Sequence, residues 1–185
     1  MIFVISGPSG VGKTTLAKMV ASRYPDMHCP VSFTTRPPKA GEQNGVHYHY
    51  VTKDVFEGMI QRKQFAEWKV VHGHYYGTLK ADLVRRGRDV DILLEIDIQG
   101  MRQIREDCKD VVAICILPTT FEELEFRIRV RKGGESEEEI DKRLATARDE
   151  VASAGEFDYQ VVNGNLGLAI RKLLEVMSIA KMVAS

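Results

Sequence analysis

The 185-residue chain has no excess of charge of either sign, since Lys plus Arg and Asp plus Glu each number 26. A basic excess is typical of proteins that bind nucleic acids or anionic membranes, so the composition indicates neither partner. Any site for an anion must therefore come from local clustering of positive groups. The length and the 44% of hydrophobic residues predict one soluble domain with a substantial core.

Cysteine and long apolar runs are also scarce. The chain has three cysteines, an odd number, and they lack the C-x-x-C spacing of a metal site. We therefore expect reduced thiols at Cys29, Cys108 and Cys115. No apolar run approaches the roughly 20 residues that cross a bilayer. The first predicted strand begins at residue 2 and leaves no room for a secretory leader, so we expect a cytoplasmic protein.

A glycine-rich stretch follows the apolar run Ile2–Ile5, and it has the pattern G-x-x-x-x-G-K-[ST]. Glycines let backbone N–H groups turn inward around a phosphate chain, where a Cβ atom would crowd the oxygens. Lys13 is expected to reach the β- and γ-phosphates, and the Thr14 hydroxyl is expected to bind Mg²⁺. We predict nucleotide contacts from Gly7, Pro8, Ser9, Gly10, Val11, Gly12, Lys13, Thr14 and Thr15.

Short continuous apolar runs recur and alternate with segments of helical period. The runs are Ile2–Ile5, Val90–Ile96, which is broken by Asp91 and Glu95, Val111–Leu117 and Tyr159–Val162. Runs without alternation of apolar and polar residues are typical of strands covered on both faces. The pattern predicts an α/β fold, a three-layer open parallel sheet of about five strands with helices on both faces.

Two segments interrupt this alternation, and they divide the single expected domain. Residues 33–79 are rich in histidine and tyrosine and are predicted to form a small inserted mixed subdomain. Residues 121–148 are densely charged and are predicted to form a helical lid with a glycine hinge. Residues 1–32, 80–120 and 149–185 would form the core.

Several helix boundaries follow from capping patterns. Asp54 with Glu57 would cap a short helix in the inserted segment, and Ser136 with Glu139 would begin a helix in the lid. Residues 121–131 remain ambiguous, because the alternation from Phe126 fits a strand while Phe121, Leu124 and Ile128 fit a helix. We favour the helix, since Thr120 and Glu123 can cap it.

An acidic pair follows the second apolar run. Glu95 and Asp97 are two positions apart, so on a strand they would point to one side, toward the phosphate loop. A carboxylate at the end of a neighbouring strand can hold Mg²⁺ directly or through water. We expect Thr14 and Asp97 to hold the metal, and the alternative is that both acids only decorate a strand end.

Seven stretches in order resemble guanylate kinase over nearly the whole chain. They are residues 5–15, Ser32–Arg36, Ala40–Glu42, Asn44–Gly45, Phe65–Trp68, Tyr75–Thr78 and Ile96–Gly100. The resemblance implies transfer of phosphate from ATP to GMP, giving ADP and GDP, with Mg²⁺ as cofactor. It implies no nucleic-acid or membrane partner, and it leaves open whether the protein is a monomer or a homodimer.

The resemblance also implies residue roles. The residues that would hold the phosphate of GMP are Arg36, Lys39, Tyr48 and Tyr76. The residues that would read guanine are Ser32, Glu67, Thr78 and Asp97, with Gly77 and Glu95 also in the acceptor site. The arginines that would lie over the transferring and ATP phosphates are Arg127, Arg131 and Arg143. Asn163 would lie near the adenine of ATP.

The chemistry of Glu67 agrees with this role, since guanine offers N1–H and N2–H as adjacent donors that a carboxylate accepts in parallel. Lys39 and Glu95 depart from the family's usual arginine and aspartate, and Lys39 lacks the bidentate fork of arginine. The alternatives are a catalytically inactive guanylate-kinase-like binding module, or a related kinase with another acceptor. Intact Lys13 and Thr14 favour an active enzyme, and Glu67 favours guanine.

Overall fold

A four-stranded parallel sheet lies at the centre of the computed structural model. The structure describes residues 1–24, 26–71, 73–84, 90–130 and 136–184. The strand order is β6 (Ile92–Glu95), β1 (Ile2–Ser6), β7 (Val111–Leu117) and β8 (Tyr159–Val162), and every neighbouring pair is parallel. His28 adds an isolated parallel bridge to Ile92. The sequence predicted about five strands, and the described residues of this sheet form four strands with one further isolated bridge.

The continuous apolar runs arise because successive residues of one strand enter two different cores. In β1, Phe3 and Ile5 join one buried cluster, and Val4 joins the other. In β7, Ile114 packs with the first cluster and Cys115 with the second. Alternate side chains of a strand point to opposite faces, so a strand covered on both faces has no polar side.

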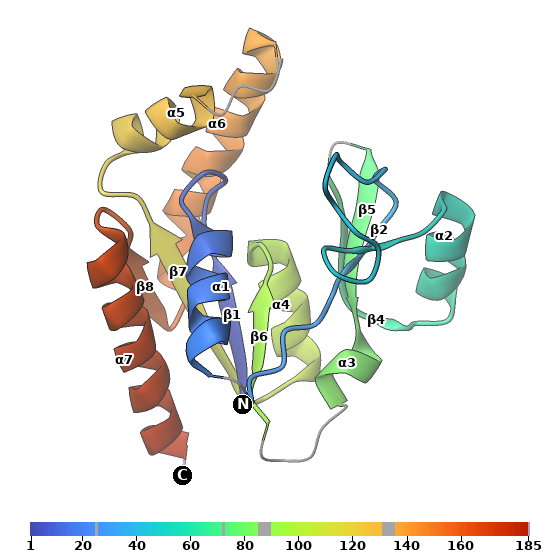
Figure 1. The fold of residues 1–185 in the computed structure, drawn as a ribbon, viewed down its shortest axis with the longest axis horizontal. Coiled ribbons are helices and arrows are strands. Elements are labelled where there is room, and N and C mark those ends of the chain that lie inside the picture. The colour runs from blue at the N-terminus through green and yellow to red at the C-terminus, as the bar shows by residue number, and fades with distance from the viewer. Residues whose placement is uncertain (25, 72, 85–89, 131–135, 185) are drawn as a thin grey trace.

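Helices cover both faces of this sheet (Figure 1). The first cluster includes residues of α1 (Lys13–Arg23), α5 (Phe121–Val130), α6 (Glu137–Ala152) and α7 (Leu166–Ala184). The second cluster includes residues of α4 (Ile98–Asp107) and of the 3₁₀ turn η1 (Ser153–Glu156). None of the described helices combines the length and apolar character needed to span a membrane.

A second, mixed sheet is built from the inserted part of the sequence. Its strand order is β3 (His49–Tyr50), β2 (Phe33–Thr34), β5 (His74–Leu79) and β4 (Phe65–Val71), and α2 (Lys53–Gln61) and α3 (Lys80–Val84) accompany it. Phe56 of α2 stacks on Phe65 and Tyr75 and forms a small separate core. Figure 1 shows this sheet beside the parallel sheet, on the side of α4.

The expected cap of α2 is wrong. Thr52 is the N-cap, and its side chain accepts a hydrogen bond from the Val55 N–H, whereas Asp54 lies in the first turn. A hydroxyl on the residue just before the helix can reach the N–H three residues on, which a carboxylate already inside the helix cannot. The strand expected around His47–Val51 is also shorter, since β3 holds only His49 and Tyr50.

The helical interpretation of residues 121–130 is confirmed, because α5 runs from Phe121 to Val130 and the Glu123 N–H donates to the Thr120 hydroxyl. The capping box at Ser136 and Glu139 is confirmed in both directions. The expected hinge glycines, Gly133 and Gly134, lie outside the described residues.

Replacing Ser136 by Ala removes one half of this capping box, so we expect the free energy of unfolding to fall by about 1 kcal/mol. For a chain of this size the melting temperature then falls by about 2–4 °C. Ser22→Ala is the control, because Ser22 is exposed within α1 and its hydroxyl only donates back to the Met19 carbonyl. Equal shifts for the two variants in thermal denaturation would contradict the role of the cap.

Candidate active site

The phosphate loop joins β1 to α1 at the carboxyl end of the parallel strands. Gly7 has φ 131°, and a Cβ atom there would lie 2.2 Å from the Ile116 carbonyl oxygen of β7. Gly12 has φ 100°, and a Cβ atom there would lie 2.6 Å from Nδ2 of Asn163. Both positions therefore require glycine for space as well as for backbone conformation.

Lys13 folds back onto this loop, and its ammonium donates to the carbonyls of Gly7 and Pro8. Burial lowers the pKa of Lys13, while the negative charges of Glu150 and Glu95 act in the opposite direction. The carbonyls of Gly7 and Pro8 thus hold the Lys13 ammonium against the loop.

Thr14 contacts Glu95 and not Asp97. The Thr14 hydroxyl donates to Oε1 of Glu95 at 2.6 Å. The β6 strand ends at Glu95, and Asp97 is the N-cap of α4, where its Oδ1 accepts the Gly100 N–H. The expectation of one strand carrying both acids is therefore wrong, and Glu95 replaces Asp97 as the carboxylate beside Thr14.

Two hydroxyl side chains form a hydrogen-bonded chain with a buried carboxylate of the second sheet. Glu67 is 3% exposed, and its Oε1 accepts a hydrogen bond from the Thr78 hydroxyl at 2.7 Å. The Ser32 hydroxyl lies 3.1 Å from the Thr78 hydroxyl and continues the chain. Burial raises the pKa of Glu67 to about 7, and the Thr78 hydrogen bond opposes this. Three of the four residues predicted to read guanine are thus brought together in one hydrogen-bonded chain.

Arg36 is held by Glu42, a residue to which the sequence analysis gave no role. Nη2 of Arg36 lies 2.9 and 3.0 Å from the two carboxylate oxygens of Glu42, which also accept from Tyr50 and from the Lys39 backbone N–H. The Arg36 guanidinium lowers the pKa of Glu42 to about 2. The guanidinium also lies 5.6 Å from the ring of Tyr48.

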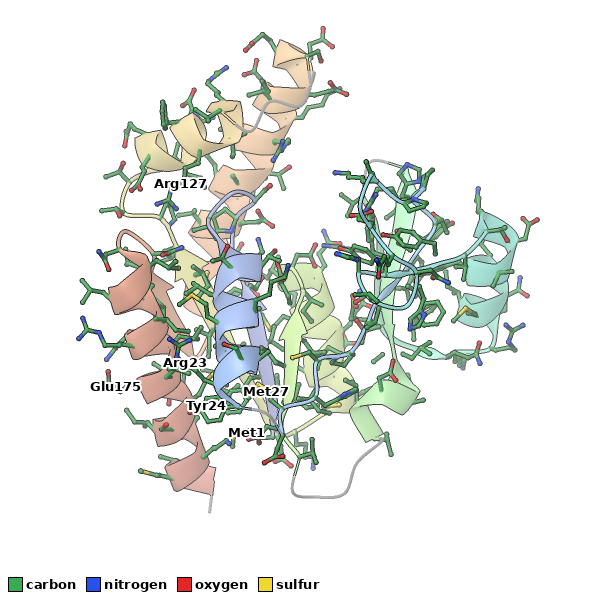
Figure 2. The ribbon with its side chains drawn as sticks, in the orientation of Figure 1. Met1, Arg23, Tyr24, Met27, Arg127 and Glu175 are labelled. Atoms are coloured by element: carbon green, nitrogen blue, oxygen red, sulfur yellow. The ribbon has the colours of Figure 1, made fainter. Side chains whose placement is uncertain are left out.

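The arginines of the predicted lid reach the phosphate loop from two directions. Arg143 on α6 donates to the Ser9 hydroxyl at 3.0 Å. Arg127 on α5 donates to the carbonyls of Val11 and Asn163. Figure 2 labels it in the upper part of the view, away from Met1, Tyr24 and Met27 lower down. Arg131 lies outside the described residues.

Asn163 supports the loop directly, because its Nδ2 donates to the Val11 carbonyl at 2.7 Å and the side chain is buried. The same amide nitrogen lies 2.6 Å from where a Cβ atom of residue 12 would be. Its position at the end of β8 thus fixes the middle of the loop, next to Arg127.

One cavity of about 670 Å³ joins the phosphate loop to the second sheet. The predicted site residues that line it are Ser9, Gly10, Gly12, Lys13, Thr14, Thr15, Ser32, Tyr48, Glu67, Tyr76, Gly77, Glu95, Asp97 and Arg143. The predicted site residues within the described parts of the chain that lie outside its lining are Gly7, Pro8, Val11, Arg36, Lys39, Thr78, Arg127 and Asn163. A phosphate loop and a buried carboxylate therefore face the same space.

Comparisons with known proteins agree with this geometry. The sequence profile described as guanylate kinase matches residues 1–180. The guanylate kinase of Syntrophotalea carbinolica is 45% identical over 178 residues, which are 96% of this chain and 84% of that protein. That of Dechloromonas aromatica is 45% identical over 179 residues, or 95% of this chain and 87% of that protein.

The chain belongs to the guanylate kinase family.

The fold agrees as well. The crystal structure of guanylate kinase from Anaplasma phagocytophilum matches with a TM-score of 0.78 at 27% identity, and the match covers 98% of this chain and 86% of that one. The resemblance and the fold class predicted from the sequence are therefore confirmed.

The cavity is also lined by residues that the sequence did not predict. They are Lys69, Val70, Val71, Ile96, Gln99, Thr146 and Glu150. Periodicity could have found some of them, because Lys69 is two residues after Glu67 on a strand, and Thr146 and Glu150 follow Arg143 by three and seven residues on a helix. Glu42 gave no such signal, because it lies in a loop.

Because the pKa of Glu67 is raised from 4.5 to about 7, the folded state binds more protons than the unfolded state between these pH values. The free energy of unfolding therefore falls as the pH rises through this window, by up to about 3 kcal/mol from this group. Glu67→Gln removes this titration. We therefore expect the free energy of unfolding of the variant, relative to that of the wild type, to be higher at pH 8 than at pH 5.

Chemical denaturation at the two pH values measures this difference. Glu106→Gln replaces an exposed carboxylate on α4 and is the control. A Glu67→Gln advantage that is the same at both pH values would show that the Glu67 carboxylate is already ionised at pH 5.

Proposed function

We propose that the chain transfers the γ-phosphoryl group of ATP to GMP, giving ADP and GDP. The observation that carries the proposal is the shared cavity, which has Lys13 and the phosphate loop on one side and the buried Glu67 on the other. One wall suits a triphosphate and the other suits a base with adjacent donors, so two nucleotides can meet with their phosphates between them.

The reaction needs no general base, because the nucleophile is an oxygen of the GMP phosphate, which is already anionic. Catalysis is then positioning and charge neutralisation along an in-line path. Lys13 would leave the loop carbonyls for the β- and γ-phosphates. Arg143 and Arg127 already lie against the loop and would neutralise the charge that develops on the transferring group.

Base selection is assigned to the hydrogen-bonded chain of Ser32, Thr78 and Glu67. An ionised Glu67 accepts N1–H and N2–H of guanine, while adenine presents an acceptor at N1 and has no amino group at C2. A buried carboxylate facing adenine would remain unpaired, so the pocket rejects adenine strongly.

The phosphate of GMP is assigned to Arg36, Tyr48 and Tyr76, with Lys39 at the exposed edge. The rings of Tyr48 and Tyr76 lie 5.9 Å apart, and Tyr48 lies beside the Arg36 guanidinium. A phenol donates a hydrogen bond without adding charge, so the charge balance is left to the two basic residues. Glu42 holds the Arg36 guanidinium in place through its two carboxylate oxygens.

Mg²⁺ is the cofactor that we propose, with Thr14 and Glu95 as its protein contacts. Their hydroxyl and carboxylate oxygens are 2.6 Å apart, and such hard oxygen donors fit Mg²⁺. The described residues contain no group of three or more His, Cys, Asp or Glu side chains suited to a metal. That agrees with an ion bound mainly by substrate phosphates, where it would offset their charge.

The segments 33–79 and 121–148 are proposed to act as acceptor subdomain and lid. Their approach would exclude water from the γ-phosphoryl group, which water would otherwise hydrolyse. ATP and GMP are cytoplasmic metabolites, and we propose that the protein works there.

The proposal is tested by a coupled assay with Mg-ATP against GMP, AMP, UMP and CMP. We expect turnover with GMP, and Lys13→Ala should lower its kcat/KM about 100-fold or more because a charge at the transferring group is lost. Lys18→Ala, on the exposed face of α1, is the control. Binding of GMP without turnover would favour a binding module, and equal turnover of AMP would overturn the role of Glu67.

Gly100 offers a further test of the base pocket, because a Cβ atom there would lie 2.9 Å from Oε2 of Glu67. Gly100→Ala should raise the KM for GMP by about 5- to 150-fold, the equivalent of 1–3 kcal/mol of overpacking, and leave the KM for ATP unchanged. Gly155→Ala is the matched control, since nothing lies within 4 Å of its Cβ position. A KM for GMP that Gly100→Ala leaves unchanged would place the base elsewhere.

A further inference from the structure

Lys69 lies on the face of the second sheet that borders the cavity. Glu67 and Lys69 are alternate residues of β4, and their partners on β5 are Thr78 and Tyr76. Alternate residues of a strand share a face, so all four side chains point the same way. Three of these four have assigned roles toward the acceptor nucleotide, and Lys69 has none.

The ammonium group of Lys69 forms an ion pair with Oδ2 of Asp97. Both side chains are about one-fifth exposed, so the pair is partly shielded from water. The pair joins β4 of the second sheet to the N-terminal end of α4, because Asp97 is the N-cap of that helix. A lysine ammonium has three donors, so this contact leaves two of them for other groups.

Asp97 is therefore fixed at both carboxylate oxygens, because Oδ1 accepts the Gly100 N–H and Oδ2 accepts Lys69. A carboxylate has about four acceptor positions, so two remain for a ligand. These two contacts hold the Asp97 side chain in one orientation in the cavity wall. A ligand that binds to its remaining lone pairs therefore costs little further conformational entropy of this side chain.

The charge around Lys69 explains why a cation is needed there. Glu67, Asp97 and Glu150 all line the same cavity, and Lys69 is the cation whose field acts on both Glu67 and Glu150. Two carboxylates that face one neutral base repel each other, and a positive charge between them offsets this cost.

We propose that Lys69 is a positioning residue for guanine recognition, which holds the Asp97 carboxylate in the orientation that accepts the exocyclic amino group of the base. The inference rests on the proposed function. Glu67 then accepts N1–H together with one proton of the amino group, and Asp97 accepts the other proton. Lys69 acts through Asp97 and touches no reacting atom.

Inosine monophosphate separates this role from a general one, because hypoxanthine has N1–H but lacks the amino group at C2. Lys69→Met should lower kcat/KM for GMP by about tenfold or more, on the scale of one base contact. It should lower kcat/KM for inosine monophosphate less than threefold, and it should leave the KM for ATP unchanged. Lys69→Gln, which keeps a polar side chain of related length, should give the same selective loss, and Lys69→Arg should restore the wild-type ratio of the two acceptors.

Lys80→Met is the matched control. It removes the ion pair between Lys80 and Asp107, which also links the second sheet region to α4 but is half exposed and lies outside the cavity lining. We expect this variant to keep both kcat/KM values. Combining Lys69→Met with Asp97→Asn should add nothing to the loss that Asp97→Asn causes alone.

Equal losses for GMP and inosine monophosphate in Lys69→Met and Lys69→Gln would overturn the inference and assign the ion pair to docking of the sheet. Unchanged kcat/KM for GMP would overturn it as well. Absence of GMP phosphorylation by the wild type is a different result, because it would remove the proposed function itself.

Discussion

The phosphate loop depends on two glycines whose backbone lies so close to its neighbours that a Cβ atom would not fit. At Gly7 the chain turns away from β1 against the Ile116 carbonyl, and at Gly12 it starts α1 against the Asn163 amide. Both neighbours are placed by the parallel pairing of β1 with β7 and of β7 with β8. The register of the central sheet thus fixes the shape of the phosphate loop, and the first core cluster maintains that register.

The N-terminal half of α4 joins the two nucleotide walls. Gly100 packs against Glu67, Asp97 pairs with Lys69, and the Gln103 amide donates to and accepts from the Trp68 backbone as a neighbouring strand would. β6 leads directly into this helix, so the end of the strand with Glu95 and the base pocket are separated by one short turn. The end of β6 and the first turns of α4 therefore contact both walls of the cavity.

Charge in the cavity is arranged at a cost to stability. Burial disfavours the ionised form of Glu67, and it disfavours the protonated form of Lys13. In the proposed function, a phosphate chain at Lys13 and adjacent donors at Glu67 would relieve both costs on binding. Arg36 differs, because Glu42 pairs with it in the free protein, so a phosphate bound there as proposed would share the guanidinium with a carboxylate.

The sequence by itself determined the phosphate loop, the parallel sheet, the helical character of residues 121–130 and the cap at Ser136, because these depend on local pattern and on periodicity. It also named Glu67, through resemblance and base chemistry. Only the tertiary structure decided that Glu95 faces Thr14 while Asp97 caps α4, since the strand ends at Glu95, two residues before Asp97, and the two acids therefore do not share a strand face. It alone revealed Glu42 and Lys69, because their partners are chosen by how a loop folds and how two sheets meet, which no spacing along the chain encodes.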